Sequence, residues 1–143
     1  MGYETFEMPK YNPPAIAGLL RKSRSIAVVG LSPKEERDSN RVARYLIEQG
    51  YQVIPVNPGH ETLLGRPCYK RLSDIPGRID IVNCFIAPFR VPPVAEEAIA
   101  VGAGALWMQI GVVHNEAAAK AGVAGVPVVM DRCIMVEHKK LLA

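Results

Sequence analysis

The chain has 143 residues, of which 49% are hydrophobic and 22% charged, as is typical of a globular domain with one core. Lysine and arginine number 17 against 14 acidic residues, and a net charge of +3 is too small for a general nucleic-acid binder. No apolar run reaches the roughly 18 residues of a membrane span, and the polar start does not suggest a secretory signal. Three unevenly spaced cysteines are typical of free thiols in a reducing compartment, so we expect a cytoplasmic protein.

The beginning of the chain predicts an arm followed by a helix. Residues 1–12 are expected to form an N-terminal arm, and residues 13–143 a single domain. Asn12 precedes two prolines, and this is a typical helix start because asparagine caps a helix and proline needs no partner in the first turn. Apolar side chains then recur three and four residues apart, which predicts a helix over Pro13–Lys22.

A strand–helix–strand unit follows. Residues 25–30 form an apolar run that ends in glycine, which is typical of a strand buried on both faces. Ser39 is expected to cap a helix, and Gly50 stands where a glycine is favoured just after the last helical turn. Residues 51–57 are a second strand, although the proline at position 55 restricts that strand to an edge or a bulge.

The same alternation continues to the end of the chain. Further strands are predicted over 80–86, 106–111 and 127–131, and further helices over 92–101, 115–121 and 133–142. The glycine- and proline-rich stretch 59–77 is expected to hold one short strand at 64–69. Strands that alternate with helices of about ten residues predict right-handed crossovers and a mainly parallel sheet. The predicted fold class is therefore α/β, a Rossmann-like three-layer fold in one domain.

Ligands of open parallel sheets bind beyond the carboxyl ends of the strands, near the point where the strand order reverses. The loop after the first strand keeps only Gly30 of the three glycines of a dinucleotide fold, because Ser32 and Glu35 stand at the other two positions. Asn57 ends the second strand in place of the acidic residue that binds an NAD ribose. Both features count against NAD as the ligand.

A phosphate ligand is nevertheless expected at the first loop. The helix after this loop presents free N–H groups that attract anions, and Lys34, Arg37 and Arg41 lie near its start. The glycine–lysine motif of P-loop nucleotide hydrolases does not occur, so that class is excluded. A second interpretation stays open, since these cations interleave with acidic residues and could form a solvated surface only.

Other residues at this predicted rim also have a structural interpretation. Gly30 could serve a tight turn alone, and residues 57–59 are a turn signal in their own right. Phe89 and Arg90 follow the third main strand, and these residue types are more often found in a core and on a surface. Each signal is weak alone. The functional interpretation depends on their convergence at one rim of the sheet.

Signals for metals and nucleophiles are poor. His60, His114 and His138 do not pair with cysteines or carboxylates at metal-ligand spacing, so neither a metal site nor a catalytic residue is expected. No nucleophile-elbow motif occurs in the chain. Cys133 is the cysteine of interest, because it follows Arg132 at the start of the last predicted helix, where a thiolate is favoured.

Four strings of the sequence together resemble the CoA-binding domain family. They lie at residues 26–32, 50–58, 75–82 and 128–138, and the most specific are P-V-N-P at 55–58 and D-R-C-I-M-V-E-H at 131–138. The family includes small stand-alone proteins, which this chain resembles closely, and the N-terminal part of the succinyl-CoA synthetase alpha subunit. The resemblance extends over about residues 13–143.

This resemblance implies a protein that binds coenzyme A or an acyl-CoA at the rim of the sheet. In the family, the segment matching 32–35 wraps the phosphates, His60 matches a ligand-contacting lysine, and the segments matching 88–89 and 108–110 line the same cleft. The expected site residues are Gly30, Ser32, Pro33, Lys34, Arg41, Asn57, His60, Pro88, Phe89, Met108, Gln109 and Ile110. The basic cluster from Lys34 to Arg41 would bind the phosphates, and Pro88 with Phe89 would form an apolar wall for adenine.

The resemblance implies binding without a catalysed reaction, because the ligase domain of the synthetases has no counterpart in this chain. An NAD(P)-linked oxidoreductase and a metabolite-sensing regulatory protein stay open as other functions. A small-molecule ligand is the expected partner, rather than nucleic acid or a membrane, and formation of a homo-oligomer is left open. We further hypothesise that Cys133 is the thiol able to form a mixed disulfide with coenzyme A, by attack on its oxidised form, whereas Asp131, as the cap of the helix, opposes this with its negative charge. The alternative is a Cys133 packed under that helix.

Overall fold

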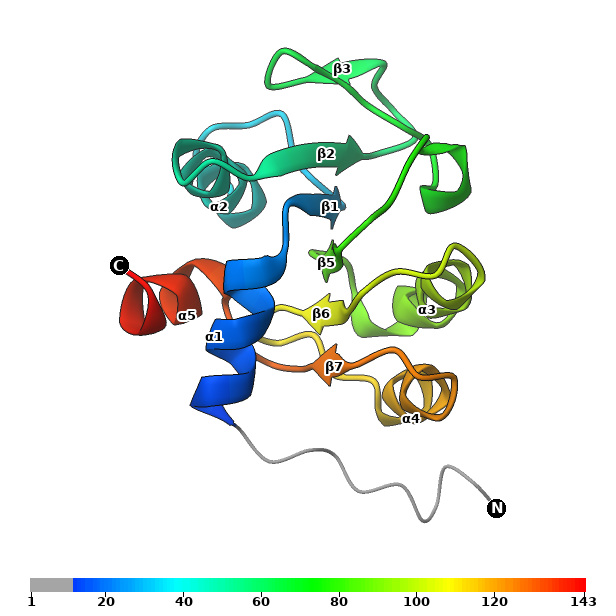
Figure 1. Cartoon of the computed structure of the whole chain (residues 1–143). Coiled ribbons are helices and arrows are strands. Elements are labelled where there is room, and N and C mark those ends of the chain that lie inside the picture. The colour runs from blue at the N-terminus through cyan, green and yellow to red at the C-terminus, as the bar shows by residue number, and fades with distance from the viewer. Residues whose placement is uncertain (1–11) are drawn as a thin grey trace.

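The computed structural model describes residues 12–143, so the predicted arm 1–12 lies outside the described residues except for Asn12. Five parallel strands form one sheet in the order β2-β1-β5-β6-β7 (Figure 1). These strands are β1 (Ser25–Val29), β2 (Gln52–Val56), β5 (Ile81–Cys84), β6 (Leu106–Met108) and β7 (Val128–Val129). Each predicted strand of the sheet is present, and all five are shorter than the sequence pattern suggests.

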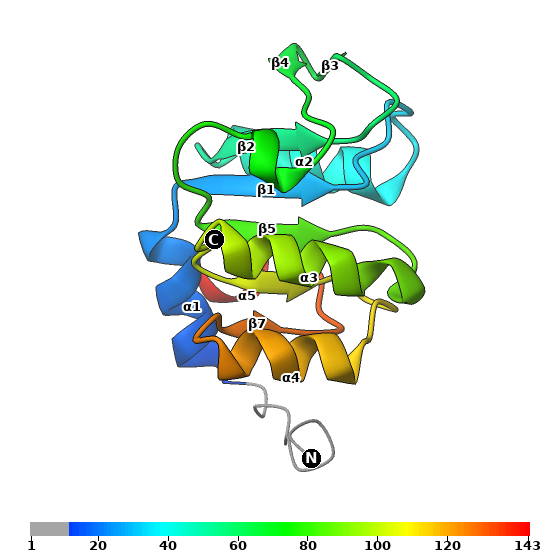
Figure 2. The ribbon, with the colours of Figure 1, turned by 90° about the vertical axis from the view of Figure 1, so that its right-hand side faces the viewer.

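Helices cover both faces of this sheet. On one face lie α1 (Pro13–Lys22), α2 (Asp38–Glu48) and α5 (Ile134–Leu141), and on the other lie α3 (Val91–Ala100) and α4 (Asn115–Val123) (Figures 1 and 2). Two short 3-10 turns, η1 (Leu72–Asp74) and η2 (Pro88–Arg90), flank the side of α3. The α/β fold with three layers, predicted from the sequence, is confirmed.

The first strand shows how one sheet supports two cores. Ile26 and Val28 belong to the core under α1, α2 and α5, whereas Ala27 and Val29 belong to the core under α3 and α4. All four side chains are buried. Because successive side chains of a strand point to opposite faces, an uninterrupted apolar run fills both cores.

The strand order reverses at β1, and this reversal positions the candidate site. After β1 the chain continues to α2 on one face of the sheet. After β5, the strand beside β1, it continues to α3 on the opposite face. The two loops therefore diverge at the carboxyl ends of adjacent strands. A crevice for a ligand is expected at such a point.

The edge strand β2 accommodates Pro55 because the backbone N and carbonyl of this residue point away from β1. Its carbonyl accepts a hydrogen bond from the Tyr69 N–H at 3.0 Å, and the Asn57 N–H donates to the Tyr69 carbonyl at 2.9 Å. Residue 69 thus forms a parallel bridge with Val56 on the outer side of the sheet. The missing N–H of a proline breaks no strand pairing at such an edge position.

Two local predictions on either side of β2 are wrong. The helix α2 begins at Asp38 with Arg37 at its cap position, and the predicted cap Ser39 instead accepts a hydrogen bond from the Ser32 N–H at 3.0 Å. The Ser39 hydroxyl therefore fixes the preceding loop. The stretch predicted as one strand at 64–69 is an antiparallel hairpin of β3 (Thr62–Leu63) and β4 (Arg66–Pro67), because Leu64 and Gly65 form its turn with positive φ angles.

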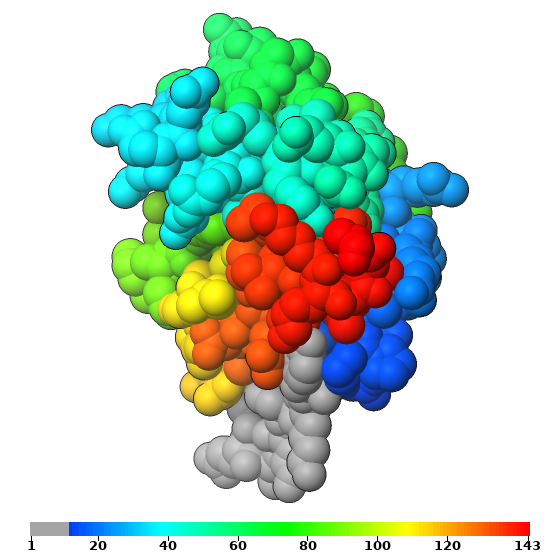
Figure 3. Space-filling view, turned by 90° about the vertical axis from the view of Figure 1, so that its left-hand side faces the viewer, coloured from blue at the N-terminus to red at the C-terminus, as the bar shows by residue number. Residues whose placement is uncertain are grey.

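The last helix, α5, lies between α2 and α1 on the face of the sheet that these helices cover (Figure 3). Its beginning is held by two side chains of the β6 region: the Trp107 indole donates to the Arg132 carbonyl at 2.8 Å, and the Gln109 amide oxygen accepts from the Ile134 N–H at 3.0 Å. Further along, His138 Nδ1 lies 2.7 Å from the Tyr45 hydroxyl of α2. Burial lowers the pKa of His138, which favours its neutral ring at this contact.

Asp80 joins the beginnings of two strands. Its carboxylate accepts hydrogen bonds from the Arg24 and Ser25 N–H groups at 2.8 and 3.1 Å and from Arg78 Nε at 2.8 Å. Burial alone would raise the pKa of Asp80, but these hydrogen bonds and the Arg78 charge outweigh burial and lower it. A carboxyl whose pKa is lowered by folding stabilises the fold above its unfolded pKa of about 3.9.

We therefore expect Asp80→Asn to cost about 1–2 kcal/mol of unfolding free energy at pH 7, since it removes a charged acceptor. The difference from the wild type should shrink as the pH falls from about 4, the pKa of the unfolded carboxyl, through the lower pKa at which the folded carboxylate takes up its proton. Urea unfolding at several pH values measures both quantities. The matched control is Asp74→Asn, because Asp74 is exposed in η1. A difference for Asp80→Asn that is constant from pH 3 to 7 would contradict the role of its charge.

Candidate ligand-binding site

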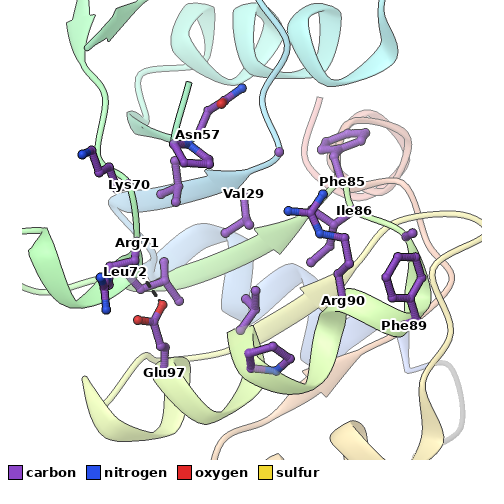
Figure 4. A pocket seen from close by; sticks show the side chains of 16 residues that line it. Val29, Asn57, Lys70, Arg71, Leu72, Phe85, Ile86, Phe89, Arg90 and Glu97 are labelled. Atoms are coloured by element: carbon purple, nitrogen blue, oxygen red, sulfur yellow. Dashed lines mark hydrogen bonds between the residues drawn. The ribbon is translucent and has the colours of Figure 1, made fainter. Parts of the chain in front are cut away.

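A pocket with a volume of about 720 Å³ opens at the carboxyl ends of β1, β2 and β5, where the strand order reverses. Its size lies within the range of about 300–1,000 Å³ that is typical of small-molecule sites. Figure 4 shows side chains converging on it from the ends of these three strands, from the η1 segment and from α3. The lining residues are Val29, Gly30, Val56, Asn57, Pro58, Lys70, Arg71, Leu72, Phe85, Ile86, Ala87, Phe89, Arg90, Pro93, Val94 and Glu97.

Gly30 ends β1 at the floor of this pocket. Its N–H donates to the Val56 carbonyl at 2.9 Å, and its φ of 86° lies in the left-handed region. A Cβ atom at this position would overlap the Phe85 carbonyl oxygen and would lie 2.9 Å from Ile86 Cγ2. The ends of three strands can therefore approach one another only because residue 30 has no side chain.

Asn57 lines the pocket and also joins two of its loops. Its side-chain amide donates to the Leu31 carbonyl at 2.9 Å, and its side-chain oxygen accepts from the Gly59 N–H at 2.9 Å. The first bond reaches the loop after β1, and the second closes the turn after β2. The turn interpretation of residues 57–59 thus holds together with a position at the pocket.

Three cations line the pocket: Lys70 and Arg71 on one side, and Arg90 on the opposite side (Figure 4). Within residues 12–143, no carboxylate forms an ion pair with any of them. All three residues are exposed, so their charges face a solvated opening. The arrangement favours an anionic ligand with charged groups spread across the pocket.

Glu97 is the acidic residue of the lining, and its carboxylate is used within the protein. One oxygen accepts from the Leu72 N–H and the other from the Ser73 hydroxyl, both at 3.2 Å. These bonds tie the η1 turn to α3. Glu97 therefore acts as a positioning residue for Arg71, which stands at the beginning of η1.

The basic cluster expected at the first loop does not line this pocket. The exposed Arg41 is ion-paired with Asp38 of its own helix. The half-buried Ser32 accepts a hydrogen bond from the Lys34 N–H at 3.1 Å, and Pro33 and Lys34 are exposed. The loop that holds these residues runs to α2, on the face of the sheet opposite to α3.

Among the other expected site residues, Phe89 lines the pocket with 79% of its surface exposed. Pro88 and His60 are exposed residues outside the lining. The segment after β6 also lies outside it: Met108 is buried in the core under α3 and α4, Gln109 holds the start of α5, and Ile110 is exposed. The structure thus brings together Gly30, Asn57 and Phe89 of the twelve expected residues.

Sequence reasoning missed the pocket cations on the η1 side. Lys70 and Arg71 occupy a stretch without helical or strand periodicity, and their place is set by the bridge of Tyr69 to β2. The signal present in the sequence is two consecutive basic residues shortly after the second strand. Arg90 stands in one of the loops expected at the rim, where the sequence leaves both a ligand contact and a plain surface position open for it.

None of the three cysteines is in a disulfide. Burial raises the pKa of Cys84 to about 12 and also raises the pKa of the half-buried Cys68. Cys133 is buried at the cap position of α5, so the predicted cap Asp131 is wrong. The Asp131 carboxylate instead accepts from the Gly111 N–H at 2.8 Å, because its φ of 61° turns the chain before the helix. The mixed disulfide of Cys133 stays a prediction.

In residues 12–143, no three histidines, cysteines or carboxylates gather in a way that could hold a metal ion. Across the same residues, each helix is too short or too polar to cross a membrane. The pocket lining itself offers apolar contacts and positive charge for the recognition of a ligand.

The sequence model described as CoA binding domain matches residues 24–139, which cover most of the chain and all five strands of the sheet. The chain belongs to this family. Its relatives include the uncharacterized protein YneT of Bacillus subtilis, which is 42% identical over 123 residues, 86% of this chain and 91% of YneT. An ADP-forming acetate–CoA ligase of Archaeoglobus fulgidus is 33% identical over 72 residues, 50% of this chain and 10% of the ligase.

Solved structures of similar small proteins have the same fold. A hypothetical protein of Pyrococcus horikoshii has a TM-score of 0.91 at 42% identity, covering 97% of this chain and 100% of its own. A protein of Thermus thermophilus has a TM-score of 0.88 at 37% identity, covering 92% and 100%. The chain thus matches small proteins over nearly their whole length, whereas it spans about a tenth of the acetate–CoA ligase.

Proposed function

We propose that the pocket at the strand-order reversal binds coenzyme A or an acyl-CoA. The observation that carries this proposal is the coincidence of the pocket with the ligand position expected for such a sheet, in a chain of the CoA-binding domain family. Family membership supports coenzyme A as the ligand class. The pocket at the strand-order reversal supports a position for that ligand.

The lining of the pocket suits the chemistry of coenzyme A. Val29, Ile86 and Val94 provide apolar surface for an adenine ring, and the cations provide partners for phosphates. The exposed ring of Phe89 lies at the opening, where it can pack against a ligand that extends into solvent. The carboxylate of Glu97, the acidic residue of the lining, is hydrogen-bonded to η1 and so serves to hold that turn. We propose a binding protein without a catalysed reaction.

Two features disfavour NAD as the ligand. The loop after β1 has serine and glutamate at the second and third glycine positions of the dinucleotide fingerprint. Asn57, at the end of β2, holds two loops together and carries no charge for a ribose hydroxyl. We further propose that the protein acts in the cytoplasm, where its three free cysteines stay reduced.

Thermal unfolding with added ligand tests the proposal. A ligand that binds the folded state at about 100 times its Kd adds roughly 2.7 kcal/mol, which raises the Tm by several degrees. We expect such a rise with coenzyme A and none with NAD at the same concentration. A rise with NAD alone, or equal rises with both, would contradict coenzyme A as the preferred ligand.

A pair of variants places the ligand in the same experiment. Phe89 and Ile110 are both exposed apolar residues, at 79% and 67%, but only Phe89 lines the pocket. Phe89→Ala is expected to weaken coenzyme A binding about tenfold, as loss of an aromatic contact does, whereas Ile110→Ala should leave it unchanged. Titration calorimetry measures both affinities. A larger loss with Ile110→Ala would move the ligand toward the loop after β6.

A further inference from the structure

The segment that follows the hairpin places two cations beside the end of β2. Tyr69 exchanges hydrogen bonds with Pro55 and Asn57 along the outer edge of this strand, at 3.0 and 2.9 Å. Lys70 and Arg71 are the next two residues of the chain, and both line the pocket. Their position is therefore set by backbone pairing with the strand itself.

The end of this strand is where nucleotide-binding sheets distinguish the ribose of adenosine. An acidic residue there binds a free ribose hydroxyl, whereas a nearby arginine accommodates a ribose that carries a phosphate. This chain has the uncharged Asn57 at that point, and both polar atoms of its side chain are already hydrogen-bonded within the protein. The charged groups beside it are the two cations.

The charge balance of the pocket points the same way. Its lining contains Lys70, Arg71 and Arg90 against one carboxylate, Glu97. That carboxylate accepts from the Leu72 N–H and the Ser73 hydroxyl, and it forms no ion pair with the cations in the described part of the chain. The cations lie on two opposite walls of the pocket. Arg90 comes from η2 after β5, across the pocket from Lys70 and Arg71 on the η1 side (Figure 4).

We infer that Lys70 and Arg71 bind a phosphate on the adenosine ribose, so that the site selects ligands by that phosphate. This inference rests on the proposed function and deepens it. For coenzyme A, the group bound is the 3′-phosphate, and the site discriminates against 3′-dephospho-coenzyme A. Arg90, on the opposite wall, contributes to affinity for phosphates common to both ligands and does not discriminate between them.

The test compares the affinities of coenzyme A and 3′-dephospho-coenzyme A by titration calorimetry. In the wild-type protein, we expect coenzyme A to bind about 10- to 100-fold more tightly, as removal of a charge-assisted hydrogen bond predicts. In Lys70→Ala/Arg71→Ala, this ratio should fall to about one while binding of the dephospho form stays unchanged. Both side chains are exposed, so the variant is expected to fold, and its Tm verifies this.

Two control variants make the test specific. Arg90→Ala should lower the affinities for coenzyme A and 3′-dephospho-coenzyme A by the same factor and so preserve their ratio. Arg66→Ala removes a positive charge from β4, outside the pocket lining, and should change neither affinity. Equal affinities of the two ligands for the wild-type protein would overturn the inference, as would a ratio that survives in the double variant or disappears in Arg90→Ala.

A smaller pair of probes separates this inference from the proposed function. Adenosine 3′,5′-bisphosphate carries the ribose phosphate without the pantetheine arm, and AMP lacks that phosphate. Preference for the bisphosphate over AMP, lost in Lys70→Ala/Arg71→Ala, supports the inference even if coenzyme A itself does not bind. Binding of coenzyme A without any preference within either pair overturns the inference and leaves the proposed function standing. Binding by none of the four probes overturns both.

Discussion

Gly30→Ala is expected to destabilise the fold by about 2–5 kcal/mol and to abolish ligand binding. A left-handed φ costs a residue with a side chain about 1–2 kcal/mol, and forcing an atom into a packed interior typically costs a further 1–3 kcal/mol. Here the φ is 86°, and the added methyl group would overlap the Phe85 carbonyl. Relief of this overlap separates the ends of β1 and β5, which form the floor of the pocket.

Gly50→Ala is the matched control for this variant. Gly50 also has a positive φ, 95°, but no atom lies within 4 Å of the position that its Cβ would occupy. It should therefore cost about 1–2 kcal/mol from the backbone conformation alone and leave ligand affinity unchanged. Urea unfolding gives the two free energies, and calorimetry gives the affinities. Equal losses of stability in the two variants would show that close strand packing at residue 30 is not the cause.

Asn57→Asp is expected to affect stability and binding together. The aspartate keeps an acceptor for the Gly59 N–H but replaces the amide that donates to the Leu31 carbonyl. Loss of that donor leaves two oxygen acceptors facing each other, at a cost of about 1–3 kcal/mol in unfolding free energy. The new negative charge in the lining should also weaken the binding of an anionic ligand by tenfold or more. This loss of affinity should become smaller at high salt, because exposed charges are screened within roughly 10 Å at 0.1 M.

The same substitution at another asparagine serves as the control. Asn12 caps α1 by accepting a hydrogen bond from the Ala15 N–H at 3.1 Å, and aspartate is an equally good cap. Asn12→Asp should therefore preserve both the unfolding free energy and the affinity for coenzyme A. An Asn57→Asp variant with the wild-type affinity at low salt would show that the ligand does not approach the end of β2.

The sequence was sufficient to predict the sheet and the place of the crevice, because both follow from local patterns. The apolar run at 25–30 predicts a doubly buried strand, and regular alternation with helices predicts the parallel order. Gly30 and Asn57 could be placed at the rim because each directly follows a strand. Their positions needed no knowledge of contacts between distant segments.

The rest of the site depends on contacts between distant residues. Lys70 and Arg71 reach the pocket through the bridge between Tyr69 and Val56, thirteen positions apart in the numbering, and no periodic pattern marks this pairing. Conversely, Arg41 lies near a helix start as predicted, yet its guanidinium pairs with Asp38 one turn away. Proximity in sequence indicated which loops share the rim, but not which side chains turn into the pocket.

The two edge strands of the sheet, β2 and β7, limit how copies of the protein can pair through their backbones. Exposed strand edges are templates for pairing with other chains, which leads to swapped dimers and fibrils. Here one border is occupied by the backbone of Tyr69 and interrupted by Pro55, which has no N–H to offer, and the other border is the two-residue β7. Continuation of this five-stranded sheet into a second molecule is thus hindered at one border by Tyr69 and Pro55, and the short β7 offers little backbone for pairing at the other.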